Sequence, residues 1–231
     1  MQLPLSIKLN DEATFTNFYA GPNAAAASAV EALSSAQPTL PDTCLYLWGP
    51  AQSGRSHLLQ AACHRMAEAD GLAMYLPLAE VQDLGPDVLE GMEQFDLLCL
   101  DQLDVLVGHA DWEEALFHLY NRLREQGSRL LMAASAAPRA MGFSLPDLAS
   151  RLGWGLVFQL HPLSDEDKQR MLMLRAELRG LQLGEEVARY LLNRGARGMG
   201  ELFQVLEQLD QASLQAQHRL TIPFVKRVMG W

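Results

Sequence analysis

The sequence predicts an α/β domain built on a parallel sheet flanked by helices, followed by a small all-helical domain. Three observations lead to this prediction. Short apolar runs alternate with helical patterns from residue 23 to residue 160, as in a parallel sheet covered on both faces. A turn rich in glycine and serine joins the first apolar run to a helix. Beyond His161 and Pro162 only helical patterns follow.

The first domain contains five candidate strands. The run from Cys44 to Trp48 is continuously apolar, which a buried parallel strand requires. The expected strands are 44–48, 72–76, 96–101, 129–134 and 156–160. Helices are expected after Asn23 as an N-cap, from about Arg55 to Ala69, and after Asp111.

The second part of the chain has clear helix boundaries. Ser164 followed by three acidic residues predicts an N-cap with a favourable first turn. That helix should run to about Arg179 and stop at Gly180. Further helices are expected near Glu185, near Gly200 and after Pro223. The predicted organisation is a flexible tail over 1–11, the α/β domain over 12–161 and the helical domain over 162–231.

Composition favours a cytoplasmic protein without a strongly DNA-binding surface. The 231 residues have a formal net charge of −10, whereas neutralising DNA phosphates needs clustered Lys and Arg, so no strong duplex binding is expected. No pattern of a signal peptide or a membrane span is found. The three cysteines have no metal-binding spacing and are expected to be buried thiols in a reducing compartment: Cys44, Cys63 and Cys99.

A phosphate-binding loop is predicted between the first strand and the helix that follows it. The pattern G-x-x-x-x-G-[KR]-[ST] is matched by Gly49, Pro50, Ala51, Gln52, Ser53, Gly54, Arg55 and Ser56. Glycines let backbone N–H groups turn toward an anion, and the helix N-terminus adds positive charge. The Ser56 hydroxyl is expected to reach Mg²⁺. The predicted ligand is ADP or ATP with Mg²⁺.

Arg55 stands where this motif usually has lysine. A lysine ammonium is a compact charge, whereas the guanidinium is planar, wider and prefers bidentate contacts. The hypothesis is that the site binds nucleotide but handles a γ-phosphate differently. ADP is therefore the expected nucleotide.

A second acidic motif follows the third strand. Asp101 is placed to hold Mg²⁺ through water. The next residue is Gln102 rather than an acid, and an amide cannot take a proton at physiological pH. Asp104 is an alternative base, but a solvated loop acid is the favoured interpretation. Weak or absent intrinsic ATP hydrolysis is expected.

Arg151 is expected on a short helix near the rim of the α/β domain. From position alone, an ordinary surface arginine paired with Asp147 is an equal alternative. However, the run from Ser150 to Gly155, SRLGWG, resembles the box VII region of DnaA-family AAA+ proteins. In that family the corresponding arginine enters a neighbour's nucleotide site. The resemblance implies that Arg151 is an arginine finger that acts in trans.

The same resemblance covers the rest of the chain. The stretches 164–168 and 220–226 are similar to the helical lid of DnaA-related regulators. Ser135 ends the fourth strand, where the family places a polar sensor of the γ-phosphate. The family often carries a second sensor, an arginine, where this chain has Gly200. Arg197 is an alternative for that role.

The N-terminal tail carries a short docking motif. Gln2, Leu3 and Leu5 resemble the peptide that enters the hydrophobic pocket of the bacterial sliding clamp, with two apolar anchors and one amide. This resemblance predicts the β clamp of DNA polymerase III as a partner.

Together these resemblances imply a negative regulator of replication initiation. It would bind the DNA-loaded clamp and stimulate hydrolysis of DnaA-bound ATP without being an efficient ATPase itself. Two alternatives stay open, namely an ATP-driven motor such as a helicase loader, and a clamp-bound adaptor for another replication protein. Whether the chain forms a homodimer is also open. Five aromatics are expected mainly in the core, with an adenine pocket or an interface as alternatives: Phe18, Tyr19, Trp48, Tyr75 and Trp112.

Overall fold

The structure, a computed structural model, describes residues 9–37, 42–194, 198–216 and 219–231. These residues form two compact units. The α/β unit contains residues 9–15 and 22–162, and the helical unit contains Thr16–Gly21 and Leu163–Trp231.

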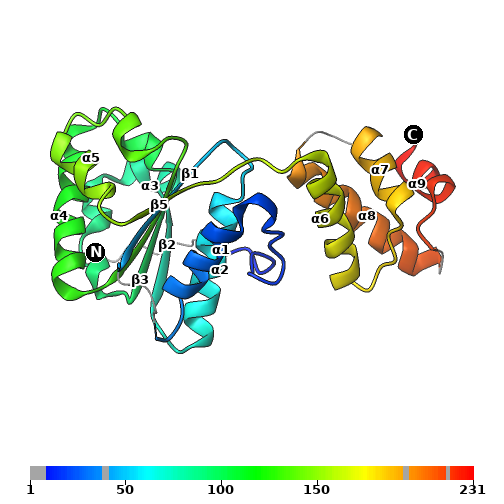
Figure 1. The fold of residues 1–231 in the computed structure, drawn as a ribbon, viewed down its shortest axis with the longest axis horizontal. Coiled ribbons are helices and arrows are strands. Elements are labelled where there is room, and N and C mark those ends of the chain that lie inside the picture. The colour runs from blue at the N-terminus through cyan, green and yellow to red at the C-terminus, as the bar shows by residue number, and fades with distance from the viewer. Residues whose placement is uncertain (1–8, 38–41, 195–197, 217–218) are drawn as a thin grey trace. The chain divides into compact units, whose positions relative to one another are not determined.

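The α/β unit is built on a five-stranded parallel sheet with the order β2-β3-β4-β1-β5 (Figure 1). Every residue of β3 is buried, in agreement with its unbroken apolar run. The predicted fold class is confirmed, with the strands Cys44–Trp48 (β1), Ala73–Pro77 (β2), Leu97–Asp101 (β3), Arg129–Ala134 (β4) and Leu156–Gln159 (β5).

Helices cover both faces of this sheet. In Figure 1, α1 and α2 lie on one side of the strands, and α4 and α5 lie on the other. Apolar side chains from the sheet and from α4 form a continuous buried cluster with the loops around them. The helices of this unit are Ala24–Leu33 (α1), Arg55–Glu68 (α2), Leu78–Val81 (α3), Ala110–Gln126 (α4) and Pro146–Leu152 (α5).

Asn23 does not cap α1 as predicted. Its side chain forms no cap hydrogen bond. Instead, its Oδ1 accepts from the His161 backbone N–H (2.8 Å) and its Nδ2 donates to the His161 carbonyl (2.9 Å). The helix starts where expected, but the Asn23 side-chain amide bonds to the backbone of His161, in the segment after β5, and not to the first turn of the helix.

Among its described residues, the helical unit has four helices, and their boundaries lie close to the predicted ones. Ser164 caps the first, since its Oγ accepts from the Asp167 N–H at 3.1 Å, and Gly180 follows its end with φ of 74°. Apolar side chains of all four form one buried cluster. The helices are Asp165–Leu178 (α6), Glu185–Arg194 (α7), Met199–Ala216 (α8) and Ile222–Met229 (α9).

Tyr19 ties the segment Thr16–Gly21 to the helical unit. Its ring packs against that unit's core, and its hydroxyl donates to Asp167 Oδ1 at 3.1 Å, across 148 positions of sequence. This interaction explains why the six residues belong to the helical unit, although the residues on both sides of them in the chain belong to the α/β unit.

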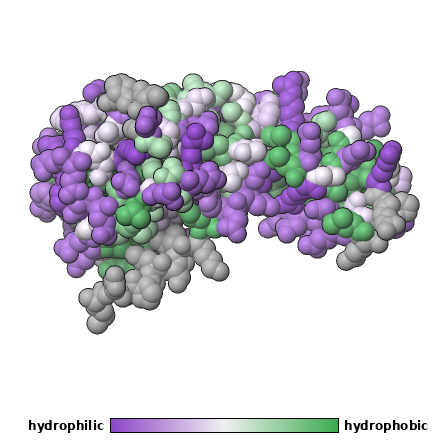
Figure 2. Space-filling view, turned by 90° about the horizontal axis from the view of Figure 1, so that it is seen from below, coloured by the Kyte–Doolittle hydropathy of each residue, from purple (hydrophilic) through white to green (hydrophobic). Residues whose placement is uncertain are grey.

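The face shown in Figure 2 is covered largely by hydrophilic side chains. In the part of the chain that the structure describes, no helix is both long and apolar enough to span a bilayer. The cysteines are free thiols, with Cys63 and Cys99 buried and Cys44 half-buried.

Candidate nucleotide site and candidate arginine finger

The carboxyl ends of β1, β3 and β4 bring three predicted elements to one edge of the sheet. The loop Gly49–Ser56 follows β1, Asp101 ends β3, and Ser135 follows β4. Trp48 pairs with Ala134 in the sheet, so the loop and Ser135 start beside each other. Open α/β sheets bind ligands at this edge.

Two glycines allow the loop to take its shape. The Gly49 N–H donates to the Ala134 carbonyl at 3.3 Å. A Cβ on Gly49 would lie 2.4 Å from the Leu160 carbonyl oxygen, which no side chain tolerates. Gly54 has φ of 99°, a left-handed conformation that favours glycine. The backbone therefore requires the glycine pattern that the sequence shows.

Two polar atoms of the loop are buried without a hydrogen-bond partner among the described residues. They are Ser53 Oγ and Arg55 Nη1. A buried donor without a partner costs about 1–3 kcal/mol. Arg55 is the first residue of α2, where helix N–H groups also favour an anion. This donor set fits the phosphates of a nucleotide.

Tyr75 connects the two residues predicted to hold Mg²⁺. Its hydroxyl donates to Asp101 Oδ2 at 2.8 Å and also bonds with the Ser56 side chain. Burial raises the pKa of Tyr75, and the negative charge of Asp101 raises it further, so this hydroxyl stays protonated. The sequence predicts Tyr75 mainly as a core residue. Sequence alone does not show that its hydroxyl lies at the carboxyl ends of the strands.

Asp104 is not the solvated loop acid that was predicted. Its side chain is half-buried, and its carboxylate accepts from the Ser135 N–H at 2.8 Å and from the Ser135 hydroxyl. The predicted sensor hydroxyl is therefore already engaged by a carboxylate. Gln102 is exposed and has φ of 62°.

Arg151 lies near the amino ends of the strands, whereas the loop Gly49–Ser56 of the same chain follows the carboxyl end of β1. A Cβ on Gly155 would lie 2.1 Å from the Cys44 carbonyl oxygen, so the segment after α5 passes directly over the amino end of β1. The loop follows the carboxyl end of that strand. The five residues of β1 span about 16 Å, and this length separates the amino end of the strand, near Arg151, from the candidate nucleotide loop at its carboxyl end.

Aromatic rings surround the Arg151 guanidinium. Its Cζ lies 4.4 Å from the Phe117 ring centroid and 5.5 Å from the Trp154 centroid. Among the described residues it forms no ion pair with Asp147, so the predicted i−4 alternative is not formed. Trp154 is 54% exposed and also has Arg124 at 4.9 Å. Two cations thus share one exposed indole ring.

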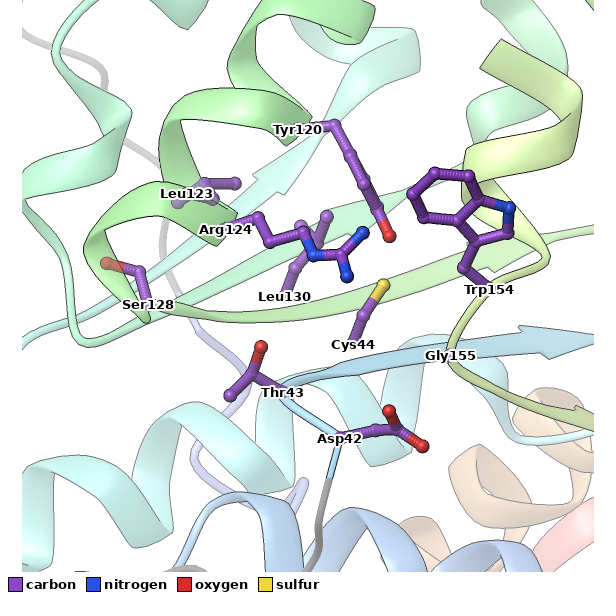
Figure 3. Close-up of a pocket in the computed structure, with 10 residues that line it drawn as sticks. All are labelled: Asp42, Thr43, Cys44, Tyr120, Leu123, Arg124, Ser128, Leu130, Trp154 and Gly155. Carbon is purple, nitrogen blue, oxygen red and sulfur yellow. The ribbon is translucent and has the colours of Figure 1, made fainter. Parts of the chain in front are cut away.

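A small pocket of about 70 Å³ lies next to this cluster. Figure 3 shows Arg124, Tyr120 and Cys44 directed toward one another, with Trp154 beside them. Burial raises the pKa of the Cys44 thiol to about 12, although a hydrogen bond from Tyr120 opposes the effect. The thiol is therefore protonated and unreactive at neutral pH. The volume suits a few waters rather than a nucleotide.

Glu113 is a buried acid that sequence reasoning missed. It is 1% exposed. Its Oε1 accepts from the Gly108 N–H at 2.9 Å, and its Oε2 accepts from the Leu145 N–H at 2.8 Å. Leu145 directly precedes α5, the helix that carries Arg151. An acid in the first turn of a helix usually faces solvent, so this role could not be predicted from the sequence.

Four of the predicted site residues lie outside the described residues. They are Gln2, Leu3 and Leu5 of the tail and Arg197 of the helical unit. Gly200 is the second residue of α8, and a Cβ there would meet no atom within 4 Å.

Comparison with known proteins identifies both units. Residues 82–159 match the bacterial DnaA ATPase domain, and residues 165–229 match the lid domain of Hda. The first match includes Asp101, Ser135 and Arg151.

Solved structures agree with this assignment. Domain III of DnaA from Thermotoga maritima has a TM-score of 0.79 at 23% identity, over 97% of this chain and 98% of that one. AMPPCP-bound DnaA from Aquifex aeolicus has a TM-score of 0.70 at 21% identity, over 90% and 68% of the two chains. RuvB from Thermotoga maritima has a TM-score of 0.64 at 16% identity, over 94% and 73%.

The solved structures show the fold, and the two family matches show which known domains the two units resemble. A P-loop ATPase domain of this class implies nucleotide binding. The chain has the DnaA-like AAA+ fold, with a stretch that matches the DnaA ATPase domain followed by one that matches the lid domain of Hda.

Proposed function

We propose that this protein suppresses re-initiation of chromosome replication by stimulating hydrolysis of the ATP bound to DnaA. The observation that carries the proposal is the position of Arg151. It stands at the sheet edge opposite its own loop, stacked on Phe117 and beside an exposed Trp154. An arginine in this place is available to the nucleotide of a second protein.

In the proposed complex, Arg151 supplies positive charge to the phosphoryl group that DnaA transfers to water. Arginine suits this task because its guanidinium is always charged and offers several donors. Charge develops on the phosphoryl oxygens in the transition state, and a trans arginine stabilises it there. The protein thus acts as an activator of another protein's ATPase.

The protein's own nucleotide, which we take to be ADP, has a structural role. Ser53, Arg55 and the loop N–H groups would hold its phosphates. Ser56 and Asp101, which share Tyr75, would hold Mg²⁺, and this ion neutralises phosphate charge when bound. Hydrolysis at this site is expected to be weak, because Gln102 replaces the usual acid and Asp104 is bonded to Ser135.

The proposed second partner is the DNA-loaded β clamp of DNA polymerase III. Gln2, Leu3 and Leu5 would enter its hydrophobic pocket and restrict the activity to newly replicated DNA. These partners place the protein in the cytoplasm. The net charge of −10 disfavours direct duplex binding, so the clamp is the component that links it to DNA.

The test is hydrolysis of DnaA-bound ATP in the presence of this protein and clamp loaded on DNA. A rise that requires all three components supports the proposal. Turnover of ATP by this protein alone would instead favour a motor or helicase loader. If neither occurs, while the protein still binds the clamp, an adaptor for another replication protein becomes the better explanation.

The tail makes a separate prediction. A variant with Gln2, Leu3 and Leu5 all replaced by alanine is expected to lose clamp binding, because two apolar anchors are removed, each worth roughly 1.5–3 kcal/mol when buried. Surface plasmon resonance on immobilised clamp measures this. The control replaces Lys8 with alanine, just beyond the motif. Unchanged binding of the triple variant would contradict the assignment.

Nucleotide binding at the loop makes another prediction. Arg55→Ala is expected to weaken ADP binding by about tenfold or more, because a charge-assisted hydrogen bond contributes about 1.5–3 kcal/mol. Titration calorimetry measures it. Arg65→Ala is the matched control on the same helix, since Arg65 pairs with Glu31 on the surface at 2.9 Å. Equal losses in both variants would argue against a phosphate contact by Arg55.

A further inference from the structure

We propose that Asp104 determines the nucleotide preference of this site by disfavouring a third phosphate. The inference rests on the proposed nucleotide binding at the loop Gly49–Ser56 and adds to it the residue that separates ADP from ATP.

The Asp104 carboxylate lies near the carboxyl end of β4, beside Ser135. Asp104 belongs to the single turn Leu103–Leu106 after β3, in which Leu103 and Leu106 are fully buried. Its carboxylate receives the Ser135 N–H at 2.8 and 3.2 Å. Ser135 follows Ala134, the residue whose carbonyl receives the Gly49 N–H. The negative charge is therefore fixed beside the first residue of the loop.

Two opposite charges act on the hydroxyl of Tyr46. This fully buried tyrosine of β1 donates its hydroxyl to the Ala136 carbonyl at 3.0 Å. Burial raises the pKa of Tyr46, the charge of Asp104 raises it further, and the charge of Arg55 lowers it. The charges of Asp104, on the turn after β3, and of Arg55, at the start of α2, thus both act on the same hydroxyl.

Asp104 does not neutralise the positive charge of Arg55 by pairing with it. Within the described ranges the two side chains form no ion pair, and Arg55 Nη1 is buried without a hydrogen-bond partner. Arg55 and Ser53 therefore remain available as phosphate donors, while the acid occupies the neighbouring position at the ends of β3 and β4.

The consequence differs for two and three phosphates. A diphosphate can use the loop donors alone. A γ-phosphate beside Ser135, the predicted sensor, meets a hydroxyl that already donates to Asp104 and a carboxylate that repels its charge. Like charges in a partly buried site interact strongly, because the effective dielectric constant is far below that of water.

The experiment measures dissociation constants of ADP and ATP with Mg²⁺ for the full chain and its Asp104→Asn variant. Asparagine keeps an oxygen to accept from Ser135 but removes the charge. We expect wild type to favour ADP, and the variant to bind ATP about tenfold more tightly than wild type while ADP affinity changes little. Glu68→Gln is the control, since Glu68 is an exposed acid at the end of α2.

A second variant separates charge from hydrogen bonding. Ser135→Ala removes the hydroxyl but keeps the backbone N–H that holds Asp104, so it is expected to retain the preference for ADP. Loss of the preference in this variant would assign it to the serine and overturn the inference.

Failure of the inference can be told apart from failure of the nucleotide site. Binding of both nucleotides to wild type with the same ADP-to-ATP ratio in Asp104→Asn would overturn the role of Asp104 alone. If wild type binds neither nucleotide, the proposed loop function falls and the inference with it.

Discussion

An Arg151→Ala variant is expected to leave DnaA-bound ATP hydrolysed at the basal rate of DnaA alone. Arginine fingers supplied in trans contribute about 10³–10⁵-fold to the rate of phosphoryl transfer, so nearly all of the stimulation should disappear. The side chain lies against the half-buried Phe117 ring and the exposed Trp154 ring, and among the described residues it forms no ion pair. The variant is therefore expected to fold, which a thermal melt followed by circular dichroism can verify.

The measurement must separate rate from docking. Single-turnover hydrolysis at increasing regulator concentration gives both the maximal rate and the half-saturating concentration. A finger lowers the maximal rate, whereas a docking residue raises the half-saturating concentration. Arg124→Ala is the matched control, since Arg124 also lies over Trp154, at 4.9 Å. If both variants change only the half-saturating concentration, Arg151 is a docking residue and not a finger.

The Glu113→Ala variant is expected to lower the free energy of unfolding by about 2–4 kcal/mol. Each carboxylate oxygen of the buried Glu113 accepts one backbone N–H, from Gly108 and from Leu145, and the substitution removes both acceptors. Urea denaturation followed by tryptophan fluorescence measures the change. Because Leu145 directly precedes α5, the helix that carries Arg151, the variant should also stimulate DnaA less than wild type does. This loss should be seen at temperatures well below the melting temperature of the variant.

Two other variants make this prediction specific. Glu113→Gln keeps one acceptor oxygen and presents an NH₂ group to the other donor, so about half of the loss is expected. Glu114→Ala is the neighbouring control, because the Glu114 side chain is 74% exposed and only 3.7 Å from His118 on the surface; its effect should stay within about 0.5 kcal/mol. Equal destabilisation at both positions would contradict the assigned role of Glu113.

The fold was predictable because its signals are local. Each strand is a short apolar run, and helix ends carry their own marks, such as Ser164 and Gly180. The loop could be recognised for the same reason, since its function depends on consecutive backbone groups. Contacts between distant segments were not predictable. Asn23 has the composition of an N-cap, but tertiary packing gives its amide to His161.

In the candidate site too, local motifs were predictable and contacts between distant segments were not. Sequence motifs named the loop, Asp101, Ser135 and Arg151, but not the pairs they form. Tyr75 on Asp101 and Asp104 on Ser135 arise from strands and turns that meet only in the folded sheet. Sequence likewise could not show that Arg151 lies near the strand ends opposite its own loop, because that depends on where β5 enters the sheet beside β1.

The place of Thr16–Gly21 has a consequence for how this protein could be divided or recombined. The chain passes between the two units three times, near residues 15, 21 and 162, rather than once. A lid exchanged between two relatives by a single junction near residue 162 would leave Tyr19 behind, and Asp167 would lose the hydroxyl that donates to it. Such chimaeras should be built with three junctions, near residues 15, 21 and 162, so that the six-residue segment is exchanged together with the helices it packs against.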